Sequence, residues 1–127
     1  MKLEVGMYVR FNDLINYSKN NIVMIDKIKF ISEVMCGLEE TLSITFEKYN
    51  EDVLKKDIIK ASYNIIDLIE VGDYVNGNPV CQIKKDEHGR TWIYTDSNYK
   101  YGYLEEDIVD VVTKEQFDRE KYVVGDR

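Results

Sequence analysis

The chain offers few side chains for acid–base or nucleophilic chemistry. Its only histidine, His88, stands beside Gly89 in a segment with the pattern of a hairpin turn, where it is expected to be a solvated loop residue. Cys81 precedes it by seven residues, but in a strand pattern such a thiol is usually packed. Cys36 and Cys81 show no CxxC spacing, so no metal site is predicted. Both are expected to be reduced, partly buried thiols, whereas one disulfide would be the alternative in a secreted protein. No catalytic residue, metal ligand set or cofactor is predicted.

Carboxylates are abundant, but they are spaced as surface residues. The runs at 39–40, 51–52 and 105–107 place neighbours on opposite sides of an extended or helical backbone, which predicts a solvated acidic rim. Asp57 and Asp107 are expected to cap the backbone of a turn. A metal-assisted hydrolase stays open as an alternative, whereas the lack of a P-loop or GxGxxG motif leaves nucleotide hydrolysis unsupported.

Aromatic side chains form the most distinctive candidate binding surface. Two rings fall on one face of a predicted strand and three on one face of the next; if these faces coincide, they make an aromatic platform. In Tudor-like and Src-homology-type barrels such platforms bind peptides, and they could equally stack bases or hold a small ligand. Cross-strand packing that only closes the hairpin is the alternative. Acidic neighbours favour a basic protein partner. The candidate partner-binding residues are Trp92, Tyr94, Tyr99, Tyr101, Tyr103, Glu105, Glu106 and Asp110.

The charge balance also favours a basic partner. Among 127 residues, 17 Lys and Arg stand against 24 Asp and Glu, a net charge of −7 that makes direct nucleic-acid binding unlikely. Up to Ile66 the counts are nine and ten (net −1), and after it eight and fourteen (net −6), so the acidity lies in the C-terminal half. A host protein with a basic surface is the expected partner.

The composition is that of a globular protein. Apolar residues make up 44% and charged residues 32% of the chain, with one proline. No run approaches the roughly 20 apolar residues of a membrane span, and no N-terminal targeting segment is recognised. With reduced thiols, this predicts a cytoplasmic protein without membrane association.

An internal repeat organises the chain. Residues 4–9 (EVGMYV) recur as residues 70–75 (EVGDYV) with five of six identical, and residues 54–59 (LKKDII) correspond in the same order to residues 104–109 (LEEDIV). The chain is therefore predicted to hold two related units. These are residues 1–64, with longer loops, and residues 65–127.

Short strands dominate each predicted unit. Strands are expected at 22–30, at 42–46 from a two-residue period, at 79–83 and 90–94 around Gly89, and at 99–103. Residues 31–40 are either helical or a long insert loop, and residues 50–60 are either a helix or a turn plus a strand. Thr113 is expected to cap a helix at 114–120 that is anchored by Phe117, after which residues 122–124 dock back on the unit. The predicted fold is mainly β, with two tandem small SH3- or Tudor-like barrels and a short C-terminal helix; an α+β fold is the alternative.

The C-terminal half resembles a known group of proteins. Residues 65–77 (IIDLIEVGDYVNG) and 111–117 (VVTKEQF) are similar to those of small, mostly uncharacterised proteins encoded by phages and prophages of low-GC Gram-positive bacteria. In that family the shared half recurs behind different N-terminal parts. The resemblance implies a phage-encoded accessory protein acting in the host cytoplasm, and it brings no catalytic residues. Some small phage proteins of this general sort block bacterial defence systems such as CRISPR.

Three functions follow from these observations. The first is a non-enzymatic phage or prophage protein that binds and inhibits a host protein, such as a CRISPR-type defence nuclease, through the acidic aromatic half. The second is a nucleic-acid-associated module, which would need a set of lysines in the N-terminal half to share one face. The third is sequestration or hydrolysis of a nucleotide signal in a pocket where cations meet rings. The lysines of the second hypothesis are Lys27, Lys29, Lys55, Lys56 and Lys60.

Overall fold

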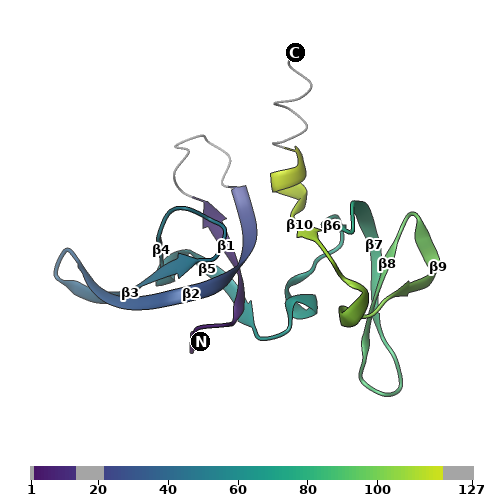
Figure 1. Cartoon of the computed structure of the whole chain (residues 1–127), viewed down its shortest axis with the longest axis horizontal. Helices are drawn as coiled ribbons and strands as arrows, with labels where there is room; N and C mark the ends of the chain where they lie inside the picture. Colours follow the sequence, from purple (N-terminus) through teal and green to yellow (C-terminus); the bar gives the residue numbers. More distant parts are fainter. Residues whose placement is uncertain (1, 14–21, 119–127) are drawn as a thin grey trace, which may run out of the picture. The chain divides into compact units, whose positions relative to one another are not determined.

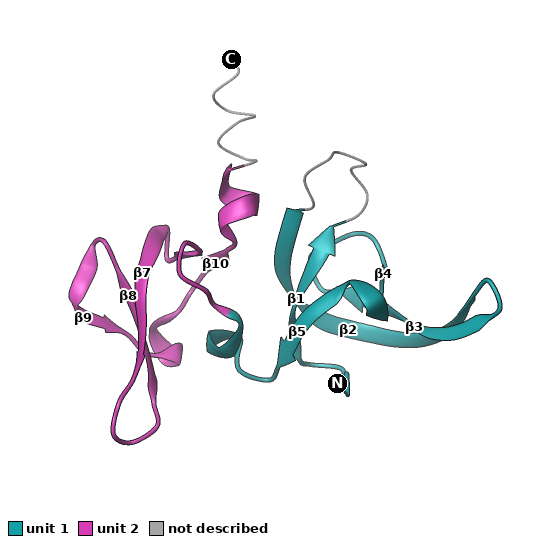
Figure 2. Ribbon diagram, turned by 180° about the vertical axis from the view of Figure 1, so that it is seen from behind, with its two compact units in different colours: residues 1–68 teal, residues 69–127 magenta. Residues whose placement is uncertain are grey.

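The chain folds as two compact β units. The computed structural model describes residues 2–13 and 22–118, and it divides the chain into Met1–Leu68 and Ile69–Arg127 (Figure 2). Each unit holds one antiparallel five-stranded sheet, and a short helix lies at 114–118, so the mainly β prediction is confirmed. Residues 65–68 belong to the first unit, where Leu68 is fully buried and its carbonyl accepts a hydrogen bond from Arg10 Nη1 at 3.1 Å.

In the first unit the strand order is β4-β3-β2-β1-β5, and every pairing is antiparallel (Figure 1). A 3₁₀ turn precedes the last strand and another follows it. The elements are β1 (Tyr8–Asp13), β2 (Ile22–Cys36), β3 (Glu39–Phe46), β4 (Val53–Leu54), η1 (Lys55–Asp57), β5 (Ile58–Ser62) and η2 (Ile65–Leu68).

The second unit repeats this topology. Its strand order is β9-β8-β7-β6-β10, which matches that of the first unit strand for strand, and a 3₁₀ turn again precedes the last strand. The strand pairings leave both sheets open, so the closed barrels of the prediction are not confirmed. The elements are β6 (Tyr74–Val75), β7 (Asn78–Lys85), β8 (Thr91–Thr95), β9 (Asn98–Tyr103), η3 (Glu105–Asp107) and β10 (Val111–Val112).

The repeated EVG sequence forms the same turn in both units. Gly6 and Gly72 have φ angles of +93° and +99°, a backbone conformation that residues other than glycine rarely adopt. The Gly6 amide donates to the Ile28 carbonyl, and the Gly72 amide donates to the Val80 carbonyl, both at 3.0 Å. The glycine of the repeat is therefore explained by the positive φ angle that the same turn needs before the first strand of each unit.

Aromatic stacking closes the core of the first unit. Phe11 and Phe46 stack with ring centroids 4.3 Å apart and an interplanar angle of 8°, and Tyr49 lies 5.2 Å from Phe11. Phe11 and Ile44 are fully buried. These residues come from β1, β3 and the segment after β3, so the core ties together parts of the chain that lie far apart in sequence.

Residues 31–40 are neither a helix nor an insert loop, so both alternatives were wrong. They continue β2 to Cys36, turn at Gly37 and Leu38, and return as β3, with Cys36 opposite Glu39. A two-residue turn with Gly at φ +69° in its first position suits the twist of such a hairpin. Residues 50–60, by contrast, follow the turn-plus-strand alternative.

Both cysteines depart from the prediction. Cys36 and Cys81 are free, as expected, but both are exposed instead of partly buried. Cys36 ends β2 at the turn of its hairpin, and Cys81 lies where β7 shifts register against β8. The hairpin end at Cys36 and the register shift at Cys81 put these thiols at the surface, and the apolar neighbours in the sequence indicate neither.

The helix start is as predicted. The Gln116 amide donates to Thr113 Oγ1 at 3.1 Å, and the Phe117 ring stacks on Tyr74 with centroids 3.7 Å apart. The end of that helix and the predicted docking of residues 122–124 lie outside the described residues. Among residues 2–13 and 22–118, no helix is long and apolar enough to cross a membrane.

Candidate functional site

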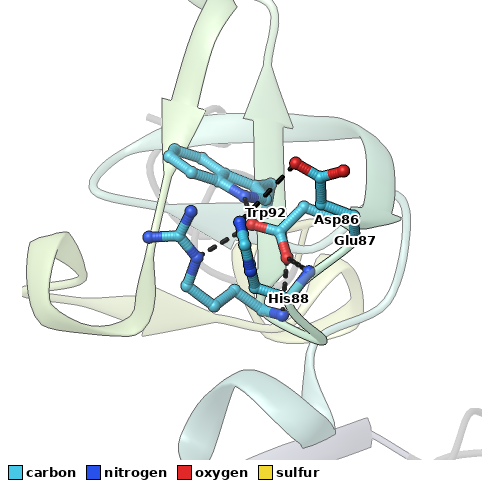
Figure 3. A network of polar contacts seen from close by, with 5 residues as sticks. Asp86, Glu87, His88 and Trp92 are labelled. Carbon is cyan, nitrogen blue, oxygen red and sulfur yellow. Dashed lines mark hydrogen bonds and ion pairs between the residues drawn. The ribbon is translucent and has the colours of Figure 1, made fainter.

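Asp86 organises the hairpin between β7 and β8 (Figure 3). Its carboxylate accepts hydrogen bonds from the indole of Trp92 at 2.9 Å, from Nε of Arg90 at 2.8 Å, and from the backbone amides of His88 and Arg90. The Trp92 hydrogen bond, followed by those from Arg90 and His88, lowers the pKa of Asp86 to about 2. His88 itself lies in the turn with its side chain 68% exposed, as predicted.

The rings of Trp92 and Tyr94 lie among cations. Lys84 pairs with Trp92 across the β7–β8 ladder, and its Nζ lies 5.9 Å from the Tyr94 ring centroid. The guanidinium of Arg90 lies 5.6 Å from the Trp92 ring. The Arg90 charge is paired with Asp86, so these two rings are surrounded by two cations and one carboxylate, which differs from the acidic surroundings expected from sequence.

A large bulge displaces β9 from the face of β8. Ile93 pairs with Tyr103 and Thr95 pairs with Asn98, so residues 99–102 of β9 lie opposite Tyr94 alone. The side-chain amide of Asn98 donates to the Gly102 carbonyl at 3.0 Å and closes this loop. The simple alternation assumed for residues 99–103 is thereby broken.

Gly102 packs the bulge against both β8 rings. A Cβ built on Gly102 would lie 3.0 Å from Cε1 of Tyr94 and 3.3 Å from Cε3 of Trp92. The residue also has a φ of +73°. Two independent constraints, the backbone conformation and the close approach, therefore favour glycine at this position.

The bulge separates the five predicted aromatic residues. Tyr99 and Tyr101 are 73% and 72% exposed, and Nζ of Lys100 lies 5.6 Å from the Tyr101 ring. Tyr103 is half-buried and pairs with Ile93, whose side chain belongs to the core. Within the described parts of the chain, no ring–ring contact joins any of the five. Trp92 and Tyr94 are packed against the bulge, Tyr99 and Tyr101 are exposed on it, and Tyr103 is a half-buried strand residue.

The predicted acidic residues are exposed and locally ordered. Glu105 and Glu106 lie in η3, where Asp107 Oδ2 accepts a hydrogen bond from the Leu104 amide at 3.1 Å, as predicted for this capping carboxylate. At the equivalent η1 no side-chain capping hydrogen bond forms, so the prediction for Asp57 was wrong. Asp110 is exposed just before β10.

Asn76 holds this acidic segment in place. Its Oδ1 accepts hydrogen bonds from the amides of Val109 at 2.8 Å and Asp110 at 3.1 Å, and its Nδ2 donates to the Asp107 carbonyl at 3.0 Å. Asn76 and Gly77 both have positive φ angles, which is the geometry of a type I′ turn between β6 and β7. The Asn-Gly dipeptide was a signal for this turn, but sequence reasoning missed the long-range hydrogen bonds.

The lysines of the first unit lie in different surroundings. Lys27 faces the Tyr8 ring at 5.6 Å and Lys29 faces the Phe30 ring at 5.9 Å. Lys55 lines an open depression of about 360 Å³ together with two carboxylates, Glu33 and Glu40. This arrangement weakens the expectation of one basic nucleic-acid-binding face.

No cluster of three or more His, Cys, Asp or Glu side chains suited to a metal ion occurs in the described residues. Comparisons with protein-family models, curated proteins and solved structures found no match to this chain. The candidate site is therefore defined by its geometry alone: an exposed tyrosine pair on a fixed bulge, followed in sequence by an ordered acidic segment.

Proposed function

We propose that this chain is a non-enzymatic phage or prophage accessory protein that binds a host protein with a basic surface. A CRISPR-type defence nuclease is the leading candidate for the partner, which the protein would inhibit by occupancy. The contact is formed by Tyr99 and Tyr101 together with Glu105, Glu106 and Asp110. One observation carries the proposal: two tyrosines more than 70% exposed stand on a bulge of fixed geometry.

Two physical properties support the proposal: the tyrosine pair loses little conformational entropy on binding, and the acidic segment attracts a basic partner. Tyrosine contributes a large contact area with few rotatable bonds, and here the Gly102 packing and the Asn98 hydrogen bond fix the backbone that carries both rings. The acidic segment is held by Asn76, so its charges are also presented in a defined position. Basic residues on a partner would find both cation–π and ionic contacts.

The shared strand order supports a finer assignment of the fold. Both units run 5-1-2-3-4 across the sheet with a 3₁₀ turn before the last strand, which is consistent with the SH3- or Tudor-like class. Peptide binding on such small β units is common, and this likeness is an analogy of fold, not of site.

The test is a salt-dependent pull-down from host lysate, followed by titration of the recovered partner. Combined Glu105→Lys, Glu106→Lys and Asp110→Lys substitutions should weaken binding at low salt by a factor of ten or more, since each rim charge contributes up to about 1 kcal/mol. The combined Glu47→Lys, Glu51→Lys and Glu87→Lys substitutions, at three exposed acids outside the proposed contact, make the same change of net charge and are the control. Equal affinity of the triple variant and the control would contradict the proposal.

A second candidate function, nucleotide or nucleic-acid binding, rests on Trp92 and Tyr94 and the cations beside them. Both rings are half-buried, and the Arg90 guanidinium and Lys84 Nζ lie 5.6 and 5.9 Å from their centroids, so a nucleotide or single-stranded nucleic acid would stack on the part of the rings that the bulge leaves open. Since Trp92 is the only tryptophan, quenching of its fluorescence by nucleotides at low salt would detect such binding. An unchanged spectrum up to millimolar nucleotide would remove this candidate.

A further inference from the structure

The β2–β3 hairpin extends beyond its neighbours in the sheet. β1 pairs with residues 22–27 of β2, and β4 pairs only with Ser43 and Ile44 of β3. Residues 30–42, which we call the arm, therefore form a two-stranded ribbon that projects from the sheet (Figure 1). Among the described residues, no strand pairs with the outer edge of β2 at 30–36. Backbone amides and carbonyls along this edge are available to another strand.

The arm has a regular and preformed geometry. Its pairs run without interruption from Ile31 opposite Ile44 to Cys36 opposite Glu39. A tight turn at Gly37 and Leu38 closes it, with Leu38 99% exposed at the tip. A strand that adds to such an edge meets a fixed backbone, which reduces the entropy lost by the protein on binding.

The charge of the arm determines which kind of strand would bind favourably to this edge. Residues 30–42 include three glutamates, Glu33, Glu39 and Glu40, and no Lys or Arg. Glu33 and Glu40 line the depression of about 360 Å³ together with Lys55, and neither forms an ion pair with another described residue. A second copy of the chain would bring three further glutamates to the edge, and each copy has a net charge of −7. Like charges disfavour self-pairing, whereas a basic strand is attracted.

The two faces of the arm differ in chemistry. Phe30 and Val34 lie on one face, where Phe30 is 59% exposed. Glu33 and Met35 lie on the other, where their cross-strand partners are Leu42 and Glu40, whereas Glu39 pairs with Cys36 on the Phe30 face. Because side chains alternate along an added strand as well, its apolar residues would face Phe30 and its basic residues would face Glu33.

We propose that the outer edge of β2 at residues 30–36 binds an extended, basic segment of a partner protein by β-strand addition. The segment alternates apolar and Lys or Arg residues. Backbone hydrogen bonds supply affinity, and the acidic face of the arm selects the sequence. This site lies in the first unit and does not depend on the function proposed for the tyrosine pair and acidic segment of the second unit.

The test uses the full chain and two defined probes. The first is a short, end-blocked peptide of alternating lysine and valine, and the second has the same composition with its lysines and valines in separate blocks. Calorimetric titration at low salt should show tighter binding of the alternating peptide. Amide hydrogen exchange should show new protection in residues 30–36 when that peptide is bound, because only strand addition engages these backbone groups.

A charge variant with a matched control completes the design. Glu33→Lys replaces an attraction by a repulsion and should weaken binding of the alternating peptide about tenfold. Glu87→Lys makes the same change of net charge at an exposed residue of the second unit and should leave the affinity unchanged. Equal binding of both peptides, equal losses in both variants, or protection of residues 30–36 that rises with protein concentration in the absence of peptide would each overturn the proposal.

Discussion

Replacing Gly102 by alanine tests the packing that holds the tyrosine bulge. Two costs add at this position. An L-residue at φ +73° loses about 1–2 kcal/mol relative to glycine. The new methyl group, 3.0 Å from the Tyr94 ring and 3.3 Å from the Trp92 ring, adds an overpacking cost of about 1–3 kcal/mol. The expected loss in free energy of unfolding is therefore about 2–5 kcal/mol.

Gly89→Ala is the matched control because it isolates the backbone cost. Gly89 has a φ of +78°, and a Cβ there meets nothing within 4 Å. It should cost only about 1–2 kcal/mol. Urea unfolding followed by the fluorescence of Trp92, the sole tryptophan, reports on the second unit in both variants.

The difference between the two variants measures the contact itself. If Gly102→Ala and Gly89→Ala lose the same free energy, the close approach of Gly102 to the two rings is not a real constraint and the bulge is not held as described. Tyr94→Ala provides a second check, since removing that ring should reduce the extra cost of the Gly102 substitution in a double-mutant cycle.

Three further predictions concern the elements around the site. Asp86→Asn should lower the urea midpoint at pH 7; because the pKa of Asp86 is depressed from 3.8 to about 2 in the folded state, the stabilisation is present above pH 4 and is lost as the pH falls towards 2, where the variant and the parent should converge. Asp96→Asn makes the same change at an exposed carboxylate of the same unit and is the matched control. Asn76→Ala should cost about 1–3 kcal/mol and release the amides of Val109 and Asp110 to hydrogen exchange, whereas Asn76→Asp retains the acceptor and should lose less. Phe11→Ala should cost about 3–5 kcal/mol, measured by circular dichroism during urea unfolding, because a fully buried ring stacked on Phe46 is removed; a loss below 1 kcal/mol would contradict the described core.

Local signals were sufficient for much of the fold. Strand alternation at 42–46, the hairpin turn at Gly89 and the cap at Thr113 each depend on a few neighbouring residues, and each was predicted. Residues 31–40 were not, because their two-stranded arm is stabilised by pairing across the hairpin and has no strong alternation of its own.

The candidate site was predictable in its residue types but not in its arrangement. Alternation placed three tyrosines of β9 on one face, whereas the bulge at 99–102 puts Tyr103 opposite Ile93 and leaves Tyr99 and Tyr101 exposed. A glycine with a positive φ can mark a bulge, but Gly102 by itself does not show how many residues the bulge contains.

The sequence by itself determined the two-unit organisation, the mainly β class and the acidity of the second half. These properties follow from composition and from repeated short motifs such as EVG, whose glycines the turns require locally. Only the tertiary structure decided which rings are covered and which are exposed, where Asn76 forms its hydrogen bonds, and which edge of β2 is left unpaired. Those features depend on contacts between residues far apart in the chain, and strand register, which local patterns do not encode, sets them.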